Sequence, residues 1–84
     1  MSVVVERHVT PEQFEKVRGS LAAKNFYFTG NSGSFEAVTK IGRVAGAFQF
    51  KDGVLRVEVT KHGMGFGKII KSQIDNGIDE AIAS

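Results

Sequence analysis

The chain has 84 residues, of which 42% are apolar and 24% are charged, and its formal net charge is +2. This length allows a single domain over residues 1–84, and the ordinary apolar content with a low net charge argues against a disordered chain. Cysteine is absent, which excludes disulfides and thiolate-bound metal centres. No apolar run is long enough to cross a membrane, and the N-terminus lacks the features of a signal peptide, so we expect a cytoplasmic protein.

Charged residues are unevenly distributed along the chain. Residues 39–71 include seven basic and two acidic residues, whereas residues 72–84 include three acidic residues and no basic one. We therefore expect the middle of the chain to form a basic surface and its last segment to form an acidic end. Proteins that bind nucleic acid usually carry a denser basic stripe, so nucleic acid is not the expected partner.

The first two elements are predicted by local signals. Residues 2–9 are rich in β-branched side chains, which favours a strand. Thr10 and Gln13 have the spacing of a capping box, which predicts a helix over residues 11–24, and Asn25 is a plausible stop for it. The apolar stripe of this helix consists of Phe14, Val17 and Leu21.

A second strand is predicted directly after this helix, because residues 26–29 are aromatic or β-branched. Residues 30–33 form a cluster typical of a turn, and residues 34–40 are expected to return as the next strand. A four-residue turn would place Phe28 opposite Phe35, with both rings on one face of the sheet.

The Asp52-Gly53 pair gives the strongest hairpin signal in the chain. A two-residue turn at this pair fixes the register of the flanking strands, and the apolar side chains then share one face. The predicted apolar pairs are Phe50 with Leu55, Phe48 with Val57, and Gly46 with Val59. The predicted pairs on the other face are Gln49 with Arg56, Ala47 with Glu58, and Ala45 with Thr60.

The last element is predicted to be a helix over residues 68–83, since isoleucine recurs at every fourth position from Ile70 to Ile82. Gly77 lies on this helix and would permit close packing. The element order is then β-α-β-β-β-α, which indicates an α+β fold with an antiparallel sheet and both helices on one face.

Such an arrangement leaves the other face of the sheet uncovered, where it is either solvated or binds a partner. Its free edge strands also favour self-association. The side chains expected on the open face are Tyr27, Val38, Ala45, Ala47, Gln49 and Thr60.

Catalytic and metal-binding motifs are not found. The two histidines, His8 and His62, are far apart in sequence and fit no zinc spacing, so we expect no metal, no cofactor and no enzyme activity. A small enzyme would need His62 as its acid or base. Residues 46–50 resemble an aromatic strand of RNA-recognition domains, but Phe48 and Phe50 face apolar partners in the predicted hairpin, which makes them core residues.

Residues 63–67 form a glycine-rich loop before the last helix, and two functions are compatible with it. An anion such as phosphate would bind the loop amides of Gly63, Gly65 and Gly67 together with Lys68. Alternatively, Met64 and Phe66 would contact an apolar surface, namely a lipid layer, a hydrophobic granule or a protein. The simplest interpretation is a connector in which Met64 and Phe66 lie beneath the sheet.

Several stretches are similar to those of small bacterial proteins of the polyhydroxyalkanoic acid system. The matching stretches are Arg7 with His8, residues 42–46, residues 57–59, Gly65 with Phe66, and residues 71–79. The resemblance implies a non-catalytic cytoplasmic protein that acts near storage granules. Together with the loop and the open sheet face, it leads us to expect a small binding module, with an anion-binding module as the alternative.

Overall fold

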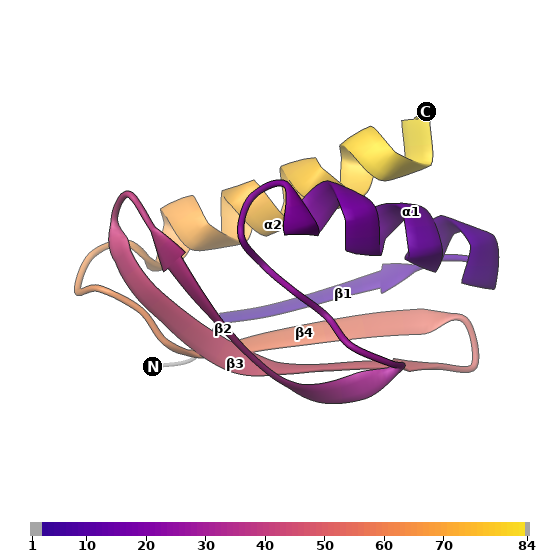
Figure 1. Ribbon diagram of the computed structural model, residues 1–84, viewed down its shortest axis with the longest axis horizontal. Coiled ribbons are helices and arrows are strands. Elements are labelled where there is room, and N and C mark those ends of the chain that lie inside the picture. The colour runs from indigo at the N-terminus through magenta and orange to yellow at the C-terminus, as the bar shows by residue number, and fades with distance from the viewer. Residues whose placement is uncertain (1–2, 84) are drawn as a thin grey trace.

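Residues 3–83 are described by a computed structural model, shown in Figure 1. The elements are β1 (Val3–His8), α1 (Pro11–Ala22), β2 (Ser32–Thr39), β3 (Gly42–Lys51), β4 (Val54–Lys61) and α2 (Gly67–Ala83). The four strands form one antiparallel sheet in the order β1-β4-β3-β2. Both helices lie on the same face of this sheet (Figure 1), so the predicted α+β fold is confirmed. Ser2, at the start of the predicted first strand, lies outside the described residues.

Helix α1 begins at the predicted capping box. The backbone N–H of Gln13 donates to Oγ1 of Thr10 at 3.1 Å, and the backbone N–H of Thr10 donates to Oε1 of Gln13 at 2.9 Å. The helix ends at Ala22, two residues before the predicted end, and Asn25 adopts the left-handed conformation, with φ of 72°, that commonly follows a helix. The predicted stripe of Phe14, Val17 and Leu21 is buried.

The prediction of a strand at residues 26–29 is wrong. This segment is irregular, and two of its backbone polar groups bond to α1 instead of to a strand. The N–H of Phe26 donates to the carbonyl of Leu21 at 2.9 Å, and Arg18 donates to the carbonyl of Phe28 at 2.9 Å. The ring of Phe28 still reaches the core, where it lies 5.2 Å from Phe35. Aromatic burial therefore holds the segment in place without a hairpin.

The β3–β4 hairpin has the predicted register over most of its length. Asp52 and Gly53 have φ values of 54° and 79°, as a tight turn of this type requires, and all three predicted apolar pairs are present. The register shifts between Ala45 and Gly46, so Ala45 pairs with Lys61 and not with Thr60. This bulge lets the hydroxyl of Thr60 donate to the carbonyl of Ala45 at 3.3 Å.

Helix α2 begins one residue earlier than predicted and packs on the sheet through its isoleucines. Ile70, Ile74 and Ile78 are fully buried. The expected close approach at Gly77 is confirmed, because a Cβ at this position would lie 2.7 Å from Cδ2 of Leu21 on α1. Arg7 of β1 forms ion pairs with Asp75 and Asp79, which join the N-terminal edge strand to this helix.

The face of the sheet opposite the helices is uncovered and mostly polar, but the expected Val38 lies on it and is 64% exposed. This face carries the ion pairs Glu6–Arg56 and Glu36–Arg43, whose side chains are between 47% and 60% exposed. Tyr27 was expected on this face and instead lies on the irregular segment, outside the sheet. Within residues 3–83, neither helix is long and apolar enough to span a membrane.

Candidate functional site

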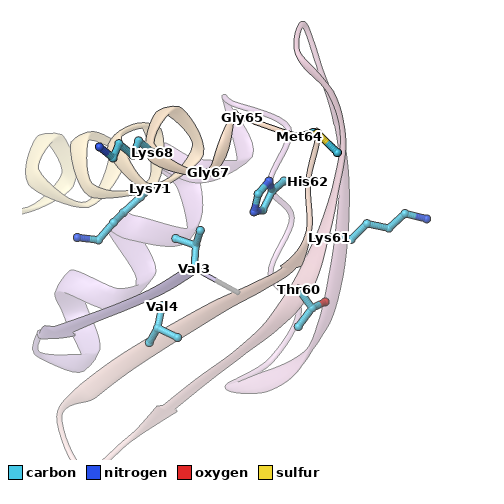
Figure 2. Close-up of a pocket in the computed structure, with 10 residues that line it drawn as sticks. All are labelled: Val3, Val4, Thr60, Lys61, His62, Met64, Gly65, Gly67, Lys68 and Lys71. Carbon is cyan, nitrogen blue, oxygen red and sulfur yellow. The ribbon is translucent and has the colours of Figure 1, made fainter. Parts of the chain in front are cut away.

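An open groove of about 1140 Å³ lies where β1, the end of β4 and the start of α2 meet. We call it the basic groove (Figure 2). The residues that line it are Val3, Val4, Thr60, Lys61, His62, Met64, Gly65, Gly67, Lys68 and Lys71.

The charges around the basic groove all have one sign. Lys68 and Lys71 extend from α2 on one side of the groove, and Lys61 lies on the other side, at the end of β4 (Figure 2). None of the groove-lining side chains in the described part of the chain is acidic. Val3 of β1 adds an apolar surface between the two sides, whereas Val4, the next residue of the strand, points to the opposite face of the sheet at the rim of the groove. The groove therefore presents cationic groups beside an apolar floor.

The start of α2 adds further positive potential. Its N-cap position is Phe66, whose carbonyl accepts the N–H of Ile70 at 3.0 Å but whose side chain offers no hydrogen-bond acceptor. The first turn of α2 contains no acidic residue. Backbone N–H groups of a helix's first turn lack partners within the helix, and the helix dipole is positive there. Unlike α1 with its capping box, α2 leaves these groups available to an external anion.

His62 occupies the middle of the groove. Its Nδ1 lies 2.8 Å from the carbonyl oxygen of Gly63, which only accepts hydrogen bonds, so Nδ1 carries the proton and donates. The ring lies against the backbone of α2, since a Cβ at Gly67 would be 3.3 Å from Cε1 of His62. A side chain at position 67 would force the imidazole to move. Glycine at this position therefore lets the ring of His62 pack directly against the backbone of α2.

The two apolar residues of the glycine-rich loop have different surroundings. Met64 is 98% exposed, so the interpretation that it lies beneath the sheet is wrong. Phe66 is half-buried, and its ring covers Gly63, where a Cβ would lie 2.8 Å from Cδ2 of the ring. Phe66 thus anchors the loop, while Met64 projects from it.

The candidate anion ligands are brought together only in part. Gly65, Gly67 and Lys68 line the basic groove, whereas Gly63 lies behind it, under Phe66. From the sequence, Lys68 was the only cation named as a ligand at this site, and the contributions of Val3 and Val4 were missed. Their contribution depends on β1 pairing with β4, and no local signal in the sequence specifies that pairing.

The turn between β2 and β3 lies beside the glycine-rich loop at the same end of the molecule (Figure 1). The carbonyl oxygen of Ile41 would be 3.4 Å from a Cβ at Gly63. This proximity brings the exposed Lys40 and Arg43 to the end of the molecule that contains the basic groove. The sequence pattern does not show that these two loops are neighbours, because they are about twenty residues apart along the chain.

Comparisons of the chain with protein-family models, with curated proteins and with solved structures found no match. The resemblance to proteins of the polyhydroxyalkanoic acid system therefore stays a prediction, as does self-association. Within residues 3–83, no group of three or more side chains is arranged to hold a metal ion.

Proposed function

We propose that the protein is a non-catalytic interaction module that binds amphipathic anionic groups in its basic groove. One observation carries this proposal: three lysines and an apolar floor line the same open groove, and no carboxylate lies among them in the described residues. An anionic group attached to an alkyl group satisfies both kinds of surface at once. A cytoplasmic location is part of the proposal.

The charged part of such a ligand is expected to bind at the start of α2. There Lys68 and the first-turn N–H groups, which lack partners within the helix, both contribute positive potential. Lys71 lies one turn further along the same side of the groove, so it adds to the positive potential. This arrangement combines the two functions that the loop suggested, anion binding and contact with an apolar surface, in one site.

A binding role is favoured over catalysis by the surroundings of His62. Its Nδ1–H is already bonded to the Gly63 carbonyl, and within residues 3–83 no carboxylate or hydroxyl group is bonded to its other nitrogen. General acid–base catalysis usually requires such a partner to orient or use the imidazole. His62 is better placed as part of the wall of the groove.

Titration with n-hexyl phosphate tests the proposal, with amide chemical shifts as the readout. We expect shifts at residues 60–71 and at Val3 and Val4, with an affinity in roughly the millimolar range. Inorganic phosphate should produce weaker shifts at the start of α2 alone, and hexanol should produce almost none. The double variant Lys68→Gln/Lys71→Gln should bind hexyl phosphate about tenfold more weakly, because two cations near the anion are removed.

The control for this titration is Lys51→Gln, which removes a lysine from the turn at the far end of the sheet. It should leave the affinity unchanged. Shifts spread evenly over all lysines, or equal weakening by Lys51→Gln, would show non-specific charge attraction and overturn the proposed function.

A further inference from the structure

Met64 is the most exposed large apolar side chain in the described part of the chain. It is 98% exposed, compared with 61% for Tyr27 and 64% for Val38. The loop holds it outward by defined contacts: Gly65 has φ of +84°, and the N–H of Phe66 donates to the carbonyl of Gly63 at 3.1 Å. The half-buried Phe66 ring fixes the other end of this turn. The exposure of Met64 is therefore built into the fold.

The surroundings of Met64 are basic and contain further exposed apolar groups. Lys61 and Lys68 flank the loop, and Ile69 in the first turn of α2 is 45% exposed. At the same end, the β2–β3 turn presents Lys40, and the neighbouring Arg43 forms an ion pair with Glu36. Exposed apolar side chains surrounded by lysine and arginine are typical of proteins that bind at the interface of an anionic membrane.

The acidic residues of α2 lie away from this end. Asp75 and Asp79 are engaged by Arg7, and Glu80 follows in the last turns of the helix. Charge is thus separated along α2, with lysines in its first turns beside the basic groove and carboxylates toward its end. An anionic surface would orient the molecule with Met64 toward it and the acidic part of α2 away from it.

We propose that this end of the molecule binds the surface of an anionic phospholipid bilayer, with Met64 inserted among the acyl chains and the lysines of the basic groove bound to lipid phosphates. This inference rests on the proposed function, since a phospholipid is an amphipathic anion. Met64 protrudes, and a protruding apolar side chain enters a fluid lipid layer without needing a matching pocket. An acidic protein partner would need such a pocket, so the lipid is favoured.

The expected affinity is modest. Each lysine held near an anionic surface contributes about a fivefold gain, and burial of one methionine contributes roughly tenfold or more. Binding should therefore be reversible and should weaken as salt is added.

Co-sedimentation with vesicles tests this inference, using phosphatidylcholine with and without phosphatidylserine. The wild-type protein should pellet only with the phosphatidylserine vesicles. Met64→Ser should weaken binding about tenfold, and the triple variant Lys61→Gln/Lys68→Gln/Lys71→Gln should weaken it roughly a hundredfold. Tyr27→Ser and Lys51→Gln are matched controls outside the groove, and neither should change binding.

Three outcomes would overturn the lipid assignment: no pelleting with phosphatidylserine vesicles, equal pelleting with neutral vesicles, or full binding by Met64→Ser. A further outcome to test for is displacement of the protein from vesicles by poly-glutamate, at a concentration that does not displace hexyl phosphate from the groove. That result would indicate an acidic protein partner, and it would also overturn the lipid assignment. If hexyl phosphate shifts the groove residues but vesicles do not bind, only the lipid assignment fails and the proposed function remains.

Discussion

The Gly46→Ala variant is expected to lose about 3 kcal/mol or more of stability, a large part of the roughly 4–13 kcal/mol available to a domain of this length. A Cβ at this position would lie 2.0 Å from the backbone carbonyl oxygen of Glu58 and 2.9 Å from Cα of Val59. Both atoms belong to the backbone of β4, so no side-chain rotation can relieve the overlap. The bulge beside Gly46 would have to open, and the hairpin would lose its register.

Thermal unfolding followed by circular dichroism measures this effect, and the melting temperature should fall by about 12 °C or more. Gly19→Ala is the control, because a Cβ at position 19 would meet nothing within 4 Å. Gly19 lies in the interior of α1, where alanine should raise stability by roughly 0.5–1 kcal/mol. Equal melting temperatures for the two variants would contradict the close approach of β3 to β4.

Phe48→Ala is the second variant for which we expect a large loss of stability. The ring is 3% exposed and stacks on Phe28, with ring centroids 4.3 Å apart and planes 8° apart. Phe48→Ala should therefore cost about 3–5 kcal/mol, since it removes a buried aromatic ring and the contact that holds the irregular segment on the sheet. Urea unfolding gives this free energy directly.

Gln49→Ala is the matched control for Phe48→Ala, because Gln49 is the next residue on β3 and points to the exposed face. It should change stability by no more than about 0.5 kcal/mol. A Phe48→Ala variant as stable as the wild type would place the ring outside the core. That result would revive the RNA-stacking interpretation, which the burial of Phe48 argues against.

Local signals predicted the elements whose partners are near in sequence. The capping box at Thr10 and the turn at Asp52 depend on residues a few positions apart, so they could be identified from the sequence. The bulge at Ala45 could not, because the alternation of apolar residues continues through it on β3. Only the paired backbones show that Ala45 meets Lys61.

The segment at residues 26–29 shows how aromatic content misleads. Its pattern suits a strand, but the chain has just left α1, and the bond from Phe26 to Leu21 keeps the backbone near the helix end. Phe28 then inserts its ring into the core from outside the sheet. Over so short a stretch, an irregular segment that packs side chains into the core shows the same alternation of buried and exposed residues as a strand.

Only the glycine-rich loop of the candidate site could be predicted from the sequence. Its glycines and Lys68 were identified from the sequence. That Phe66 is half-buried while Met64 is exposed depends on the close contact of Phe66 with Gly63. The apolar floor depends on strand order, which places Val3 beside the end of β4. Both features arise from tertiary packing, and the sequence pattern alone does not contain them.

The Met64 end of the molecule is the surface that we propose to meet an anionic partner. The chain contains no tryptophan, so Met64→Trp places a single indole at this point, which can be excited selectively over Tyr27. With phosphatidylserine vesicles its emission should shift to the blue and be quenched by brominated lipid chains, whereas Tyr27→Trp should keep the emission of a water-exposed indole. Emission from Met64→Trp that stays unchanged when the protein sediments with the vesicles would contradict the account.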